Sequence, residues 1–76
     1  MDVAPRISTD PGIHHGAHVI AGTRVPVSLV VGSLGAGMSK EEVMREYGLT
    51  AADVDAALSY AAEVVAATEV VSLAPA

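Results

Sequence analysis

The chain has 76 residues and no cysteine, so it is long enough for one domain and cannot use disulfides or thiolate metal sites. Its net charge of −5 argues against a protein that holds nucleic acid by charge alone, because such binding needs several bases at phosphates. With 51% apolar residues but no Phe or Trp, the core must be aliphatic and small, which favours stabilisation by a second copy of the chain.

We expect a single, mainly α domain over residues 1–76, with a β arm over 1–26, a three-helix unit over 27–69 and a short tail over 70–76. The N-terminus lacks the basic start and apolar stretch of a signal peptide. No apolar run reaches the roughly 20 residues of a membrane span. We therefore expect a cytoplasmic protein without a membrane partner.

The beginning of the arm is rich in turn residues. Residues 1–6 are expected to form a loose tail, and Arg6–Thr9 a short strand. Asp10–Gly12 predicts a turn, because aspartate accepts from nearby amides, proline fixes φ and glycine tolerates a positive φ. An unpaired strand edge in such an arm would invite a second chain to pair with it.

The second half of the arm ends at the first helix. Val19-Ile20 predicts a strand, Ala21-Gly22 a tight turn, and Thr23–Val25 an extended segment. The residue before a proline is pushed out of the helical region, so Pro26 should stand near a helix start. We assign the partner contacts of this arm, above all in a homodimer, to Val19, Ile20, Gly22, Thr23, Arg24 and Pro26.

His14, His15 and His18 raise the question of a metal site. On a strand, His14 and His18 would share a face but lie about 13 Å apart, which is too far for one metal ion. No Asp, Glu or Cys is placed to complete a tetrahedral site locally. We expect loop or interface histidines, and neither a metal nor another cofactor.

Arg24 is a lone base in an apolar segment. A guanidinium in this setting often anchors the chain by forked contacts with a carboxylate or with helix-end carbonyls. The alternative is direct contact with a partner molecule. We further expect Gly22 and Thr23 to be turn residues, and Tyr60 to be a core or interface aromatic whose hydroxyl finds a polar neighbour.

Residues 27–36 carry apolar side chains at i, i+3, i+4 and i+7, which predicts the first helix. The expected inner positions are Val27, Val30, Val31 and Leu34. Gly32 and Gly35 each cost about 1 kcal/mol relative to alanine in a helix interior. We expect them to allow another backbone to approach closely, within the domain or across a dimer, and Gly37 to cap the end of the helix.

Ser39 and Glu42 have the spacing of a capping box, which predicts a second helix over 40–47. Gly48 ends this helix. The side chains expected to face inward are Val43, Met44 and Tyr47.

Thr50 and Asp53 repeat this capping pattern with a shorter acid and open the third helix. The apolar face expected to point inward comprises Val54, Ala57, Leu58, Ala61, Ala62 and Val65. Val64 and Val70–Leu73 extend the apolar character beyond that face. A helix that is apolar nearly all round is usually covered by more than its own domain, so this end could fray or pair with a partner.

The second and third helices, joined by Gly48–Thr50, have helix-turn-helix spacing, and with the first helix they predict a homeodomain-like unit. A recognition helix needs Arg, Lys, Asn or Gln to read base edges, whereas the third helix carries acids such as Asp55 and Glu63 and no base. Contacts with DNA would fall instead to Arg6, Arg24, Lys40 and Arg45. The alternative for the two helix bases is that they are solvated surface charges.

Most of the sequence resembles the small prokaryotic family known as domain of unknown function 433. The resemblance covers about residues 7–65. It rests above all on Val19–Val27, which contains Gly-Thr-Arg-Val-Pro, and on Ala56–Ala62. The further matching positions are Asp10-Pro11, Gly16, Ala36–Ser39, Glu41-Glu42, Glu46-Tyr47, Leu49-Thr50 and Asp53-Val54.

Members of this family look like antitoxins of type II toxin–antitoxin pairs, often encoded beside a nuclease-like toxin of the PIN class. The resemblance implies a homodimer of homeodomain-like helical units behind a short β arm or hairpin. This chain departs from the family at Asp55, where members commonly carry arginine, and in the tail after Ala66, which holds no base. Toxin contact would then fall to Arg6 or Arg24 in the arm.

These observations leave three classes of function. The first is an antitoxin-like binding protein, a homodimer that binds a PIN-like nuclease toxin, and the alternative to it is a helix-turn-helix regulator acting at its own promoter. The third class, an enzyme, is not expected. The sequence offers no nucleophile–base pair, no phosphate loop and no paired carboxylates at a plausible site.

Overall fold

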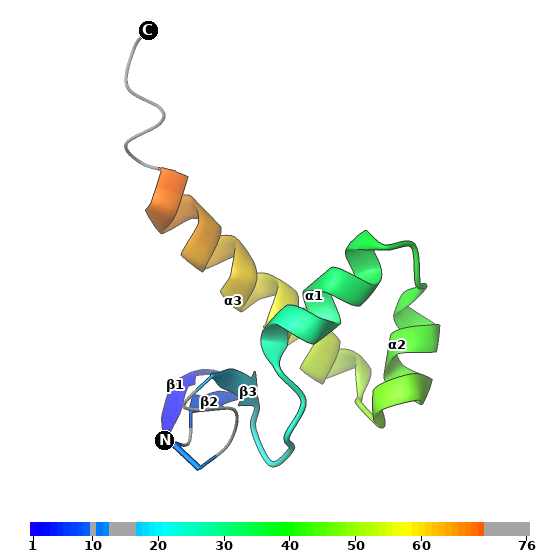
Figure 1. Cartoon of the computed structure of the whole chain (residues 1–76), viewed down its shortest axis with the longest axis horizontal. Helices are drawn as coiled ribbons and strands as arrows, with labels where there is room; N and C mark the ends of the chain where they lie inside the picture. The colour runs from blue at the N-terminus through cyan, green and yellow to red at the C-terminus, as the bar shows by residue number, and fades with distance from the viewer. Residues whose placement is uncertain (10, 13–16, 70–76) are drawn as a thin grey trace, which may run out of the picture.

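Three short strands precede three helices in the computed structural model of the chain, which describes residues 1–9, 11–12 and 17–69. The elements are β1 (Asp2–Ala4), β2 (Ile7–Thr9), β3 (His18–Ile20), α1 (Val27–Gly35), α2 (Lys40–Tyr47) and α3 (Ala51–Glu69). The strands gather at one end of the molecule, and α1 and α2 lie beside the first part of the long α3 (Figure 1). The fold is mainly helical with one small antiparallel sheet.

The prediction of a loose tail over residues 1–6 is wrong, because residues 2–4 form β1 and pair antiparallel with β2. The paired residues are Asp2 with Ser8 and Ala4 with Ile7. Pro5 and Arg6 make the turn between the strands, and Arg6 has a φ of +63°. Proline followed by a residue with positive φ is typical of a type II turn, in which glycine or asparagine usually takes the second place. Because an arginine takes that place here, the residue types do not indicate the turn.

The two strands expected from the sequence are confirmed as β2 and β3, which pair antiparallel in a sheet of order β1-β2-β3. Ile7 and Ile20 are fully buried and belong to one apolar cluster with side chains from all three helices. Val19 is 1% exposed. The segment expected to be an arm is therefore part of the core. The turn predicted at Asp10–Gly12 lies partly outside the described residues.

The loop between β3 and α1 is held by its own hydrogen bonds. Gly22 reverses the chain with a φ of +80°. The Thr23 hydroxyl donates to the carbonyl of Ile20 at 2.8 Å and accepts from the amide of Val25 at 3.0 Å. The turn roles expected for Gly22 and Thr23 are confirmed.

α1 follows Pro26 directly and ends at Gly35, one residue before the expected end. Gly37 then takes a φ of +108°, and the amides of Gly37 and Met38 donate back to carbonyls in the last turn of the helix. This pair of bonds is a Schellman motif, which needs a residue that tolerates positive φ. The capping role predicted for Gly37 is confirmed.

α2 has the boundaries and the cap that the sequence predicts. The Glu42 amide donates to the Ser39 hydroxyl at 3.1 Å, and the Ser39 amide donates to the Glu42 carboxylate at 2.8 Å. The backbone hydrogen bond from Ser39 holds the pKa of the Glu42 carboxyl below its usual range. Gly48 ends the helix with a φ of +66°, and Val43 is fully buried.

The inner face predicted for α3 is correct only in the first part of the helix. Val54 and Ala57 are fully buried, but Leu58 is 41% and Val65 is 50% exposed, and Ala62 is exposed as well, so the prediction is wrong for these three. Every described side chain from 62 to 68 is exposed. The helical period was identified correctly, but α1 and α2 lie beside only part of the length of α3 (Figure 1).

The core is small and aliphatic. Its buried residues are Ile7, Val19, Ile20, Val27, Val30, Val43, Leu49, Val54 and Ala57. No polar or charged side chain is buried in the part of the chain that the structure describes. The tail predicted over 70–76, with Val70–Leu73, lies outside that part. Because so little apolar area is buried, each helix cap and each contact contributes a large share of the free energy of unfolding.

Ser39→Ala removes the hydroxyl that caps α2, and we expect it to lower the free energy of unfolding by about 1 kcal/mol. Urea denaturation followed by circular dichroism measures this loss. Ser59→Ala is the control, because Ser59 is exposed within α3 and away from both helix ends. Equal stability of the two variants would show that the cap contributes nothing.

Candidate functional site

α1 and α3 enclose an open apolar groove with a volume of about 470 Å³. Each helix lines it with residues at i, i+1, i+4 and i+5, which lie on one helix face. α1 contributes Val27, Ser28, Val31 and Gly32, and α3 contributes Tyr60, Ala61, Val64 and Val65. Ala17 and His18 complete the lining. We call this feature the α1–α3 groove.

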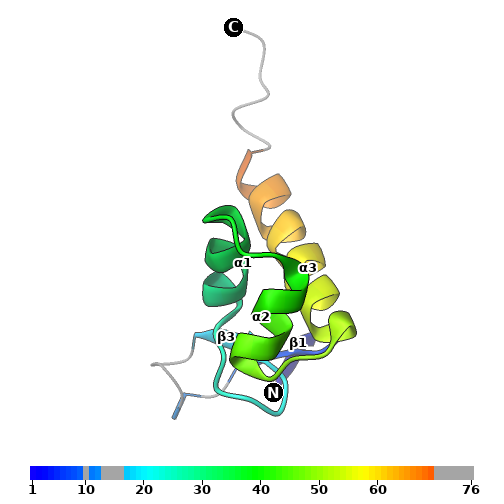
Figure 2. The same ribbon diagram turned by 90° about the vertical axis from the view of Figure 1, so that its right-hand side faces the viewer.

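The second part of α3 projects beyond the other elements in both views (Figures 1 and 2). We call its exposed residues 62–68 the projecting half of α3. Val64 and Val65 keep 46% and 50% of their surface exposed, and Glu63 is the one charged residue in this stretch. Apolar side chains on a projecting helix gain free energy when another surface covers them. The α1–α3 groove and the projecting half together form a candidate interaction surface.

Gly32 and Gly35 have no neighbour that would explain them within the chain. A Cβ added to either would meet no atom within 4 Å among the described residues. The expectation of a close backbone approach inside the domain is therefore wrong at both positions. Close approach across a dimer stays a prediction, and only Gly32 of the two lines the α1–α3 groove.

His18 and Tyr60 form a polar pair at this groove. The Tyr60 hydroxyl lies 2.9 Å from Nδ1 of His18, and the two rings meet edge to face at 83° with centroids 5.2 Å apart. The prediction that the Tyr60 hydroxyl finds a polar neighbour is confirmed. His14 and His15 lie outside the described residues.

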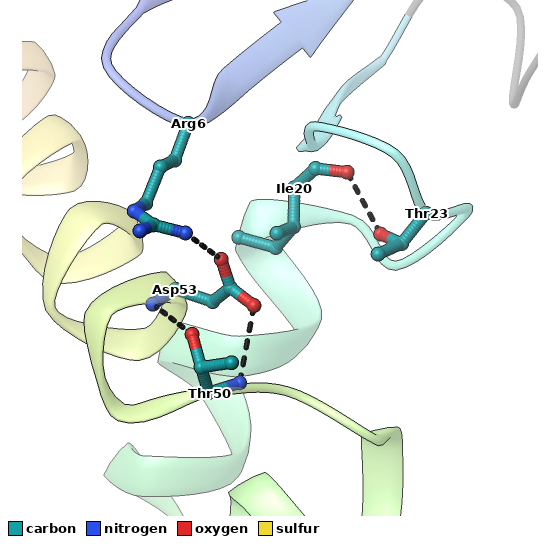
Figure 3. Close-up of polar contacts among 5 residues, drawn as sticks. All are labelled: Arg6, Ile20, Thr23, Thr50 and Asp53. Carbon is teal, nitrogen blue, oxygen red and sulfur yellow. Dashed lines mark hydrogen bonds and ion pairs between the residues drawn. The ribbon is translucent and has the colours of Figure 1, made fainter.

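A second polar site connects the sheet to the start of α3 (Figure 3). Arg6 reaches from the β1–β2 turn, and its Nη1 donates to Oδ1 of Asp53 at 3.1 Å. The other carboxylate oxygen of Asp53 accepts from the amide of Thr50 at 3.1 Å, while the Thr50 hydroxyl accepts from the Asp53 amide at 3.1 Å. One carboxylate therefore caps α3 and holds the sheet. The sequence predicted the cap but not the arginine that joins it.

These contacts change the acidity of Asp53. The backbone hydrogen bond from Thr50 is the main cause that holds the pKa of the Asp53 carboxyl below its usual range, and Arg6 adds to this effect. The side chain of Asp53 is 15% exposed, whereas that of Arg6 is 55% exposed. A partly covered ion pair of this kind contributes up to about 1 kcal/mol.

The helix bases singled out for DNA or toxin contact differ in their surroundings. Lys40 lies at the start of α2, and its Nζ donates to Oδ1 of Asp55 in α3 at 2.6 Å. Asp55 thus neutralises the base nearest to it. Arg45 is exposed in the last turn of α2, on the same helix as Glu42, whose pKa it helps to lower. Two of the four predicted contact bases, Arg6 and Lys40, are therefore paired with acids of α3.

The residues assigned to a partner arm are divided between the interior and the surface. The side chains of Val19 and Ile20 are buried in the chain's own core, so they are not exposed to a partner in this state. Gly22 and Arg24 are exposed, while Thr23 and Pro26 are partly buried. The anchoring role of Arg24 and its alternative, contact with a partner, both stay predictions.

The described part of the chain offers neither a metal site nor a membrane-spanning helix. Within it, no three side chains of His, Cys, Asp or Glu are placed to hold a metal ion. None of α1, α2 and α3 is both long enough and apolar enough to cross a membrane. The features that this part offers for contact are the α1–α3 groove, the projecting half of α3 and the exposed bases.

A family model described as "Protein of unknown function (DUF433)" matches residues 7–61, which include all of the sheet beyond β1, all of α1 and α2, and the first part of α3. The chain belongs to the DUF433 family. The resemblance proposed from the sequence is thereby confirmed. The family match ends at the point where the projecting half of α3 begins.

Two solved structures are similar to this DUF433 chain. A DUF433 member protein from Anabaena variabilis is 36% identical, with a TM-score of 0.72 over 76% of this chain and 58% of that protein. Rv2018 from Mycobacterium tuberculosis is 35% identical, with a TM-score of 0.63 over 68% of this chain and 24% of its own. The chain therefore matches only part of the length of each. No curated protein matches it in sequence.

Asp53→Asn keeps the size of the side chain but removes its charge, and we expect it to lower the free energy of unfolding at pH 7 by about 1 kcal/mol. Because folding lowers the pKa of Asp53, its contribution is present above the usual carboxyl range and is lost as the pH falls through that range. Urea denaturation at neutral and acid pH should show the gap between wild type and variant shrink in acid.

Asp55→Asn is the matched control for this prediction, because Asp55 lies in the same helix but is 63% exposed. We expect its effect at neutral pH to be smaller than that of Asp53→Asn. A stability gap for Asp53→Asn that stays constant between the two pH values would contradict the role of its charge.

Proposed function

We propose that this DUF433 chain is a non-enzymatic binding protein of the cytoplasm, the antitoxin of a type II toxin–antitoxin pair. In this proposal it acts as a homodimer and binds a PIN-like nuclease toxin. The observation that carries the proposal is the uncharged, apolar α1–α3 groove beside the projecting half of α3. A surface of this kind supports contact with protein better than contact with nucleic acid or a polar substrate.

The electrostatics also support a protein partner. The chain carries a net charge of −5, and α1 contains no charged residue. A nuclease of the PIN class has an acidic, metal-binding site, so an antitoxin that covers it needs a base. Arg24, before α1, and Arg45, on α2, are exposed bases that can serve. The contact with the toxin and the contact between copies then involve different residues.

The alternative is a helix-turn-helix regulator, with the three helices as a homeodomain-like unit. The connection from α2 through Gly48–Thr50 to α3 favours it. The acids Asp53 and Asp55 on α3 weigh against it, because each takes up a base that could otherwise meet a phosphate. We therefore rank it second.

We expect the purified chain, in stoichiometric excess, to stop cleavage by the nuclease that this proposal assigns to an adjacent gene. Arg24→Glu and Arg45→Glu make the same charge change on the loop before α1 and on α2. The variant that lifts inhibition locates the contact, because a carboxylate repels the acidic site. A nuclease that stays fully active in excess wild-type chain would refute the antitoxin function.

For the alternative, we expect no retardation of a DNA fragment from the chain's own promoter in a mobility-shift assay at low salt. The chain has nine acids and four bases, and Arg6 and Lys40 are paired with acids of α3. Retardation that weakens in Arg45→Glu, but not in the charge-neutral control Ser59→Ala, would favour the regulator instead.

A further inference from the structure

We infer that the α1–α3 groove is the contact between two copies of this chain, and that it receives the projecting half of α3 from the second copy. The inference rests on the homodimer in the proposed function and names the surface that forms it. It does not depend on which toxin is bound. Four features of the described residues support it.

The first feature is that both halves of the contact lie side by side on one chain. A twofold dimer uses the same patch on each subunit, so the patch must be complementary to itself. The groove is an open hollow between α1 and α3. The adjoining projecting half of α3 extends beyond the other elements (Figures 1 and 2). Val64 and Val65 belong to both, since they line the groove and are about half exposed. When two copies exchange their projecting halves, the groove of each is filled by the same residues.

The second feature is the absence of charge. The chain carries thirteen charged residues, nine acids and four bases, yet none of them lines the α1–α3 groove. Two copies with a net charge of −5 each repel one another, so their contact must lie where no acid is buried. A neutral groove meets this condition. A partner recognised by its charge would instead be expected to meet charged residues around the groove.

The third feature is the open face of Gly32. It lies in the interior of α1, where glycine costs about 1 kcal/mol relative to alanine, and no atom of the described chain fills the space above it. Ser28, one turn earlier on the same face of α1, also lines the groove and is small. With no side chain at Gly32 and a short one at Ser28, the backbone of a second helix can come close to α1 at this point. Gly32 is thus the position of closest approach between the copies.

The fourth feature decides between a second copy and another protein. The core holds nine apolar residues and no buried polar group among the described residues. A core of this size gives marginal stability on its own. The partner that completes it must be present whenever the chain is, and a second copy meets that condition without any other gene product.

The test is sedimentation of the full chain and two matched variants at micromolar concentration. Gly32→Leu puts a side chain into the groove, while Gly35→Leu makes the same change in the same helix outside it. A Cβ at either position meets no atom within 4 Å among the described residues, so we expect both variants to fold, which circular dichroism checks. We expect wild type and Gly35→Leu to sediment as dimers. Gly32→Leu should raise the dimer dissociation constant at least about tenfold, which is about 1.4 kcal/mol.

A second pair keeps the test decisive if either leucine variant misfolds. Val64→Lys places a charge in the groove, and Ser59→Lys places the same charge on an exposed position of α3 outside both the groove and the projecting half. We expect only Val64→Lys to dissociate the dimer. A wild-type monomer would overturn the inference, as would a Gly32→Leu or Val64→Lys variant that dimerises as tightly as its control.

The nuclease assay separates this inference from the proposed function. A chain that dimerises through the groove but leaves the nuclease active supports the interface and refutes the antitoxin role. A monomeric chain that still stops cleavage overturns the interface and leaves the antitoxin role in place.

Discussion

The docking of the small sheet on the start of α3 is the constraint on which the other features depend. Ile7 and Ile20 enter the core shared by all three helices, and Arg6 holds Asp53, which also caps α3. The sheet thereby fixes one end of α3, while residues 62–68, toward its other end, are exposed among the described residues. A chain with so few large side chains cannot cover both ends of a long helix. The exposed apolar half of α3 follows from this shortage, and the groove beside it is the surface that a partner can use.

The features of the fold that depend on near neighbours in sequence could be predicted. The cap at Ser39 and the helix end at Gly37 each involve residues within five positions, so their patterns are legible without a structure. β1 was missed because it depends on Arg6 adopting a positive φ, which the residue type does not suggest. Leu58 and Val65 were misplaced because helical periodicity marks an apolar face but does not say how far neighbouring elements extend along it.

The sequence predicted an apolar surface for a partner, but it did not predict which residues of the site contact one another. An apolar excess on the third helix and an unexplained glycine in the first both indicated a partner, and the structure places Gly32 and Val64 in one groove. The ionic partners could not be foreseen, because Arg6 and Asp53 are 47 residues apart. A sequence gives the number of charges but not which of them meet. For that reason bases expected to reach outward were found to be paired with acids inside the chain.

The sequence separation of these contacts has a consequence for how the molecule opens. The helix caps join residues three positions apart, whereas His18 and Tyr60 are 42 positions apart. Closing a longer loop costs more conformational entropy, so contacts of this range form after local ones. The sheet is then expected to dock after the local turns of the helices have formed. Ala17 and His18, at the start of β3, belong to the groove lining, so detachment of the sheet removes one wall of the groove while the helices persist. The shape of the groove is thereby tied to a segment that is held by contacts distant in sequence.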